Sequence, residues 1–435
     1  MDDRPGVPGA AAPSAAAGAA PRGRTTAPYG RCLLVGLGGL FAGVTGPLLS
    51  TFVPPLARDV LGEQRTAIGL VMAIDNVLLL LLVPWAGAIS DRAVAGRRSR
   101  LPLVLAGFLL AAVGMALFPT SARLGLAGFI AAMVLLYTGI NLQRSPFQAL
   151  LADLVPSRYR SLATGSTTFQ MCVGAIAFLM LGRLLGMPGA FRLAAVTVLG
   201  IAAAFAIGLR ARGGARSMVS EPTFASILDA ARAVVRGAAP GMRAVFAASL
   251  LLQLTFQTFT TWFALHGTER FGVRPEDVTI GFIAWAGGGA LGALPAGLVG
   301  VRLGRRRAML FGFGSMTICL LALHAAADVG HVPLLLALAS ASWTLPMVNA
   351  YPLFVEPVPA ARRGSLAAMF LLCMALGGAL GDPLNGALFD LAGGYRPLFL
   401  LMTAYTALAF AAVRAIPRGA GEADTGPDAV ALRPA

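Results

Sequence analysis

The chain is poor in charge and in the residues that build metal sites or disulfides. Charged residues make up 12% of its 435 residues, against 57% hydrophobic residues. A soluble domain carries about 25% charged residues, so this chain has too little polar surface to cover a globule in water. Its mean hydropathy is +0.77, and its apolar residues come in blocks of about twenty, the length that crosses a membrane. The composition excludes a soluble enzyme, a disordered chain and a secreted disulfide scaffold.

Lysine is absent, and all 34 basic residues are arginine, which sets the formal net charge at +15. We interpret this bias as the mark of a bacterium with a GC-rich genome. The arginines lie in short clusters between apolar blocks, which argues against nucleic-acid binding. Most of them fall in alternate loops. By the positive-inside rule, this places both termini in the cytoplasm of a multi-pass protein of the plasma or inner membrane.

The four cysteines and three histidines show no metal-ligand spacing and no disulfide framework. Cys32, Cys172, Cys319 and Cys373 each lie in a different apolar block. No phosphate-binding loop of the kind that an ATP-driven pump needs is visible. We therefore expect no metal, no cofactor and no enzymatic activity.

Hydropathy predicts twelve membrane-spanning helices in two sets of six. The predicted spans are 32–56, 66–88, 101–119, 123–145, 162–185, 190–209, 243–266, 278–300, 308–327, 332–355, 365–390 and 396–414. The predicted organisation is a disordered cytoplasmic tail (1–30), a six-helix bundle (31–209), a cytoplasmic linker (210–242), a second six-helix bundle (243–414) and a disordered cytoplasmic tail (415–435).

The two halves repeat a loop motif, which indicates internal pseudo-symmetry. Asp153 begins Asp-Leu-Val-Pro and is followed by Arg160, while Glu356 begins Glu-Pro-Val-Pro and is followed at the same spacing by Arg363. The loop after the second span is likewise echoed after the eighth, with Val301 in place of the acid. Parallel six-helix repeats are an architecture of secondary transporters.

Residues 87–98, GAISDRAVAGRR, resemble the signature loop of the major facilitator superfamily. Residues 72–76 (MAIDN), 141–160 and 377–386 resemble, more specifically, its sugar:cation symporter branch, which includes sucrose-transporter-like proteins. The resemblance implies an all-α fold of twelve transmembrane helices in two pseudo-symmetric bundles. There are departures: Gln148 stands where plant-type members carry arginine, and the fifth span lacks the Gly-Pro motif of drug–proton antiporters.

Two acids lie inside predicted spans, Asp75 in the second and Asp382 in the eleventh. Both sit roughly 14 Å from the outer end at ~1.5 Å per residue. An ionised carboxylate there costs at least about 2.5–3.5 kcal/mol, so both are candidates for binding a coupling ion, H⁺ or Na⁺. The alternative is structural: Asp75 with Asn76 joins helices, and Asp382 caps a helix kinked at Pro383.

The resemblance implies a conformational role for the signature loop. Ion pairs among the cytoplasmic loops would hold the two halves together in one state and break in the other. The predicted gate residues are Gly87, Asp91, Arg92, Arg97, Asp153, Arg160, Glu356 and Arg363. The alternative is that they only anchor the topology.

Polar and aromatic residues within spans are candidates for the solute cavity. Gln253, Gln257 and Thr261 recur at a spacing of four, which gives the seventh span one polar face. The full set is Asn76, Asn141, Arg144, Gln170, Gln253, Gln257, Thr261, Trp262, Trp285, Asn349 and Tyr351. Arg144 fits either a gate pair or an anionic group of the solute.

The sequence therefore predicts a monomeric secondary active transporter in the lipid bilayer that works by alternating access. Its expected activity is symport of a small-molecule solute, a sugar or glycoside, with H⁺ or Na⁺. An exporter of a small hydrophobic metabolite or drug by proton antiport is the first alternative. A lipid or lysolipid carrier, a non-transporting sensor or scaffold, and a membrane enzyme are the others.

Overall fold

The computed structural model describes residues 29–96, 99–155, 159–210, 232, 236, 241–326, 328–355 and 363–416. Within these ranges the chain is almost entirely helical and forms no strand. Helices are the expected outcome for apolar blocks of this length, because lipid offers no partner for backbone N–H and C=O groups. The predicted all-α fold is confirmed.

The N-terminal half contains six labelled helices. They are α1 (Tyr29–Leu61), α2 (Arg65–Met72), α3 (Ile74–Ala95), α4 (Leu101–Ser121), α5 (Gly125–Leu154) and α6 (Arg160–Arg210). The second predicted span is divided into α2 and α3 by a break at Ala73. The fifth and sixth spans run together as α6 and meet at Gly186, whose φ of 65° and ψ of 177° are non-helical. Glycine adopts this conformation without the Cβ penalty of other residues.

The C-terminal half contains the other six. They are α8 (Met242–Phe271), α9 (Pro275–Leu303), α10 (Arg305–Ala325), α11 (Val332–Val355), α12 (Arg363–Ala392) and α13 (Leu398–Arg414). The turn between α8 and α9 is typical of the helix ends: Gly272 ends α8 at φ 63°, and Pro275 begins α9. Each of the twelve predicted spans overlaps a described helix. Seven described helical segments are long and apolar enough on their own to cross a membrane.

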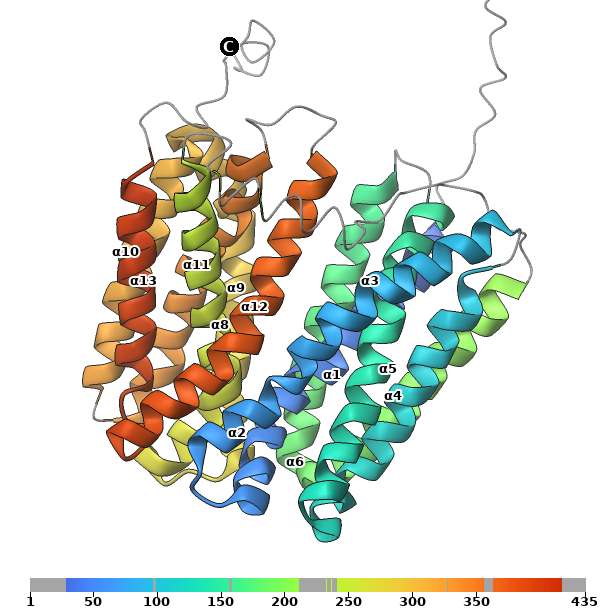
Figure 1. Ribbon diagram of the computed structural model, residues 1–435, viewed down its shortest axis with the longest axis horizontal. Helices are drawn as coiled ribbons and strands as arrows, with labels where there is room; N and C mark the ends of the chain where they lie inside the picture. The colour runs from blue at the N-terminus through green and yellow to red at the C-terminus, as the bar shows by residue number, and fades with distance from the viewer. Residues whose placement is uncertain are drawn as a thin grey trace, which may run out of the picture.

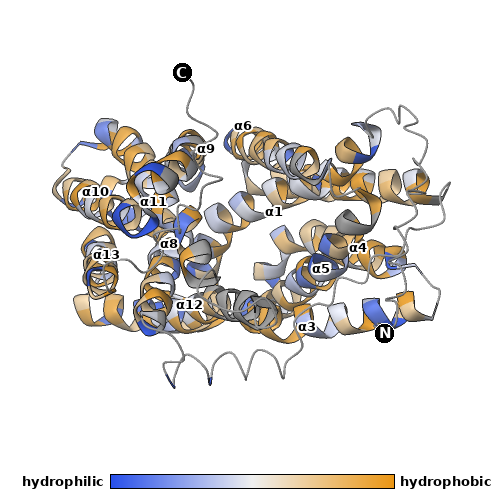
Figure 2. Ribbon diagram, turned by 90° about the horizontal axis from the view of Figure 1, so that it is seen from above, coloured by the Kyte–Doolittle hydropathy of each residue, from blue (hydrophilic) through white to orange (hydrophobic). Residues whose placement is uncertain are grey.

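Helices α1 to α6 gather on one side of the molecule and α8 to α13 on the other (Figure 1). In the first group α1 packs along α6 and α4 along α5; in the second, α11 packs along α9 and α10. Hydrophobic residues spread around the periphery of both groups (Figure 2), and Leu184 and Leu391 are 78% and 86% exposed. Such exposed leucines fit a surface that faces lipid. The predicted linker and tails fall almost wholly outside the described residues, so the domain boundaries stay a prediction.

The two groups meet along a seam that is tightest between α2 and α12. Glycine makes this approach possible: a Cβ on Gly69 of α2 would overlap the backbone carbonyl of Asp382, and one on Gly386 of α12 would overlap that of Arg65. Further along, α1 contacts α8 and α9, and α6 contacts α9. The α2–α12 contact closes one end of the seam.

Candidate functional site

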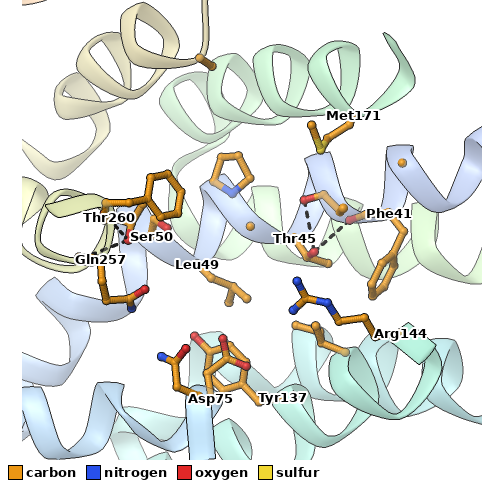
Figure 3. Close-up of a pocket in the computed structure, with 18 of the residues that line it drawn as sticks. Phe41, Thr45, Leu49, Ser50, Asp75, Tyr137, Arg144, Met171, Gln257 and Thr260 are labelled. Carbon is orange, nitrogen blue, oxygen red and sulfur yellow. Dashed lines mark hydrogen bonds between the residues drawn. The ribbon is translucent and has the colours of Figure 1, made fainter. Parts of the chain in front are cut away.

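A cavity of about 840 Å³ lies between the two halves (Figure 3). Small-molecule sites in proteins span about 300–1,000 Å³, so the volume suits a small solute. Its wall runs from Gln148 and Thr164, near the helix ends where α1 and α6 begin, to Pro54, Met72 and Phe282, which lie seven residues from the opposite helix ends at Leu61, Arg65 and Pro275. The cavity therefore reaches from near one end of the seam past its centre and stops before the contact of Gly69 and Gly386 between α2 and α12.

Asp75 lines this cavity and is partly exposed to it. Asn141 on α5 donates from Nδ2 to Asp75 Oδ1 at 2.8 Å, and also to the Tyr137 carbonyl at 3.0 Å. Asn76 lines the cavity beside it. Asp75 therefore joins α3 to α5 through Asn141, and its carboxylate still faces the cavity.

Arg144 and Asp75 are the only charged residues among the described side chains that line the cavity. Arg144 on α5 is exposed, and its guanidinium extends into the space bounded by Thr45 and Leu49 of α1 (Figure 3). Gln148, one turn further along α5, is also exposed there. Two opposite charges facing one cavity of low polarity interact more strongly than they would in water.

Asp382 is fully buried and does not line the cavity. Gln257 on α8 donates from Nε2 to Asp382 Oδ2 at 2.9 Å and to Thr261 Oγ1 at 3.2 Å, and both Gln257 and Thr261 line the cavity. Asp382 Oδ1 has no hydrogen-bond partner within the described part of the chain. The helices that carry the two acids, α3 and α12, pack against each other, as the resemblance implied.

Trp285 joins the cavity wall, but five other candidates with described side chains do not line it. They are Asn141, which is fully buried, Gln170, Gln253, Trp262 and Asn349. Gln170 Nε2 donates to the Leu33 carbonyl at 3.0 Å and joins α6 to α1, while Asn349 Nδ2 donates to the Ala296 carbonyl at 3.2 Å and joins α11 to α9. Their amide groups are engaged by the backbone of a neighbouring helix, which removes them from the solute path. The side chain of Tyr351 lies outside the described residues.

Sequence reasoning missed part of the wall. The C-terminal half contributes an aromatic surface in which Phe259 stacks on Trp285 with ring centroids 4.2 Å apart, flanked by Phe256 and Phe282. The N-terminal half adds mainly small and polar residues, among them Thr45, whose hydroxyl donates to the Phe41 carbonyl at 2.9 Å. The spacing of four between Arg144 and Gln148 was a signal available in the sequence; the aromatic surface required the packing of α8 on α9.

Among the described residues, the acid of the signature loop pairs with an arginine that was not among the predicted gate residues. Asp91 Oδ1 accepts from Arg100 Nη1 at 2.6 Å, and the same nitrogen donates to Ser90 Oγ at 2.6 Å. Arg100 is 3% exposed, whereas Arg92 is exposed. Asp91 is therefore held by Arg100, which the sequence reading did not single out. Gly87 is buried on α3.

The rest of the predicted gate falls on residues of which nothing is described. Arg97 and Glu356 lie outside the described ranges, as do the side chains of Asp153, Arg160 and Arg363. Closure of the halves at that end stays a prediction.

The opposite end carries ion pairs between the halves that were not predicted. Asp390 of α12 accepts from the backbone N–H of Arg65 (3.0 Å) and of Thr66 (2.8 Å) and from the Thr66 hydroxyl (2.6 Å). It thereby satisfies free N–H groups at the start of α2. The Arg65 guanidinium lies 3.7 Å from Asp390, 3.8 Å from Glu269 and 4.8 Å from the centre of the Tyr395 ring. We call these five residues the latch.

A second pair supports the latch from the far side of the seam. Arg183 on α6 lies 3.3 Å from Asp277 at the start of α9. Both pairs join residues of the two halves at the same end of the molecule. This end is closed by charge as well as by glycine packing.

The family model described as Major Facilitator Superfamily matches residues 35–381 and, in a second match, 245–431. No curated protein sequence matches the chain.

Solved structures share the fold at low identity. A mutant of the nucleoside transporter NupG is similar with a TM-score of 0.71 and 15% identity, covering 89% of this chain and 100% of its own. A D-xylose-proton symporter is similar with a TM-score of 0.69 and 15% identity, covering 89% and 98%. A bacterial homologue of the human lysosomal transporter Spinster, inward-facing and unoccupied, gives 0.66 and 13%, covering 91% and 98%.

Proposed function

Since the chain belongs to the major facilitator superfamily and is a multi-pass membrane transporter rather than an enzyme, we propose that it carries a sugar or glycoside together with a proton by alternating access. The observation that carries this proposal is the central cavity. It lies between two halves, one charged pair faces it, and it is sealed at one end by ion pairs that join the halves.

The conformation follows from the predicted topology. If both termini are cytoplasmic, α2 begins at the outer surface, and the latch closes the outer end. The wall residues near the start of α1 and α6 then lie toward the cytoplasm. On this reading the structure is an inward-facing state, and opening the latch while the inner loops close gives the outward-facing one.

Asp75 is the proposed proton carrier in this state. It faces the cavity, and Asn141 holds it without neutralising its charge. Arg144 faces the same space. A carboxylate that meets water from one side in one state and from the other side in the second can load and release a proton across the membrane.

A polar solute fits the rest of the wall. Gln148, Gln257, Thr164 and Thr261 provide amide and hydroxyl groups, and Trp285 contributes an aromatic face to one side. The similar solved structures include a nucleoside transporter and a D-xylose-proton symporter, which supports a polar, ring-shaped solute. The aromatic surface of the C-terminal half also favours the second candidate, export of a small hydrophobic metabolite by proton antiport.

Transport in proteoliposomes tests the proposal. Purified protein is given labelled D-xylose, sucrose, uridine and an aromatic glucoside, with and without an inward pH gradient. We expect uptake of at least one sugar or glycoside to be accelerated by the gradient, and Asp75→Asn to lose that acceleration while it retains exchange of solute for solute. Asn349→Leu, a polar residue outside the cavity, is the matched control. If no probe moves, or if the gradient drives probes out rather than in, sugar symport is refuted.

A further inference from the structure

Gln257 connects the cavity to an acid that the cavity does not reach. Asp382 on α12 has no exposed surface, whereas Gln257 on α8 lines the cavity. Its Nε2 donates to Asp382 Oδ2 at 2.9 Å and to Thr261 Oγ1 at 3.2 Å. A carboxamide has two N–H donors and one carbonyl acceptor. Both N–H groups are engaged within the wall, so Oε1 is the atom left for a ligand in the cavity (Figure 3).

We propose, building on the proton-coupled transport argued above, that Gln257 is a positioning residue that links the proton on Asp382 to the hydrogen bond offered to the solute. An ionised Asp382 only accepts, so Gln257 must turn its N–H groups toward it and Oε1 toward the cavity. A protonated Asp382 donates its O–H to Oε1. The carboxamide then turns by half a rotation, and its N–H groups face the cavity. Thr261 suits both states, because a hydroxyl donates or accepts.

The direction of coupling depends on the solute atom that meets Gln257. An oxygen that only accepts, such as a ring or glycosidic oxygen, finds an N–H donor only when Asp382 is protonated. Such a solute binds the protonated protein better, and by reciprocity its binding strengthens proton binding by the same factor, typically about 5- to 150-fold. Symport requires this positive coupling between solute binding and proton binding. A group that only donates would reverse it, so the inference assigns a sugar ring or glycosidic oxygen to this position.

Besides Gln257, the hydrogen-bonding side chains that face Asp382 are those of Thr261 and Trp262, both on α8. Asp75 on α3 is the titratable residue whose charge acts on Asp382, and the charges of both acids act in turn on Tyr137 of α5. The hydroxyl of Tyr405 on α13 donates instead to Asn385 Oδ1, at 2.8 Å. The titratable residues of α2 and α8 lie nearer the helix ends: Arg65, Arg243, His266, Glu269 and Arg270. A change at Gln257 therefore acts on Asp382 directly.

Labelling of Asp382 tests the inference without knowledge of the solute. Dicyclohexylcarbodiimide modifies protonated carboxyl groups in apolar surroundings, and peptide mass spectrometry reports the modified fraction of Asp382 over a series of pH values. Gln257→Leu removes a donor that favours the ionised carboxylate. The proton affinity of Asp382 should therefore rise about tenfold or more, and the pH of half-maximal labelling should rise with it. Gln257→Met, of similar length, replaces the leucine variant if that one does not fold. Gln253→Leu, on the same helix and without a bond to Asp382, should leave the midpoint unchanged.

A transport measurement completes the test. In proteoliposomes given labelled sucrose and D-xylose, Gln257→Leu should retain exchange and lose acceleration by a pH gradient. If the wild type moves neither probe, sugar symport fails while the labelling still decides the role of Gln257. An unchanged labelling midpoint in both Gln257 variants overturns the inference, and so does a midpoint that moves equally in Gln253→Leu.

Discussion

The latch makes a quantitative prediction for Asp390→Asn. The carboxylate accepts three hydrogen bonds from Arg65 and Thr66, at 2.6 to 3.0 Å, and lies 3.7 Å from the Arg65 guanidinium. A hydrogen bond to a charged group is worth about 1.5–3 kcal/mol and one to a neutral group about 0.5–1.5 kcal/mol. Asparagine keeps a neutral acceptor, so the variant loses the difference on each bond together with the ion pair.

Solvent reduces this loss. The Asp390 side chain is 35% exposed, and exposed ion pairs contribute only about 0.2–1 kcal/mol. We therefore expect the closed latch to lose about 1–2 kcal/mol, which changes a two-state ratio about 5- to 30-fold. High salt should produce a smaller change in the same direction in the wild type, because ions screen charges at the surface.

Distance measurements between spin labels report the equilibrium. Labels at Gln64→Cys and Ala392→Cys lie on exposed positions beside the latch. The wild type should show mainly a short distance, and Asp390→Asn should add a population at a longer one. Asp328→Asn is the matched control, because Asp328 accepts from Gly330 within its own half, at 3.1 Å. Identical distance distributions for wild type and Asp390→Asn would refute the assignment of a latch.

Two glycine substitutions test the close packing at the seam and the bend within α6. Gly386→Ala places a Cβ against the Arg65 carbonyl and should open the latch end of the seam. The Cβ of Gly297→Ala, the control, meets no atom within 4 Å and should leave that end closed. The spin labels at positions 64 and 392 measure both variants. Gly186→Ala forces an L-residue into φ 65°, ψ 177°, which should cost about 1–3 kcal/mol and lower the thermal midpoint of unfolding in detergent. Gly200→Ala, in open space, is its control. An unaltered midpoint for Gly186→Ala would contradict the strain assigned to this bend.

Much of the fold could be predicted because lipid imposes a simple rule on the chain. Apolar blocks of sufficient length must be helices, and each predicted span overlaps a described helix. The break at Ala73 and the continuous run of α6 through Gly186 could not be predicted. Both depend on how neighbouring helices pack, and the hydropathy of the sequence does not report packing.

The sequence indicated those site residues that are individually unfavourable in a membrane. It did not indicate residues that matter only through an ion pair with a distant residue. Asp75 and Asp382 stood out because acids are expensive in lipid. Arg65 and Asp390 did not, because each is an ordinary charge at a helix end, and only the fold brings together residues 325 positions apart. The same holds for Arg100, whose role appears only when it reaches Asp91.

Alternating access is the central claim, and locking the latch tests it most directly. In a variant without its native cysteines, Thr66→Cys and Asp390→Cys are joined by a short bis-methanethiosulfonate crosslinker, which forms a reducible disulfide with each thiol, and solute exchange is followed in proteoliposomes. The account predicts that crosslinking stops transport, that reduction restores it, and that a cysteine at Gln148 stays reactive from the cytoplasmic side throughout. Transport that continues with the latch locked would contradict it.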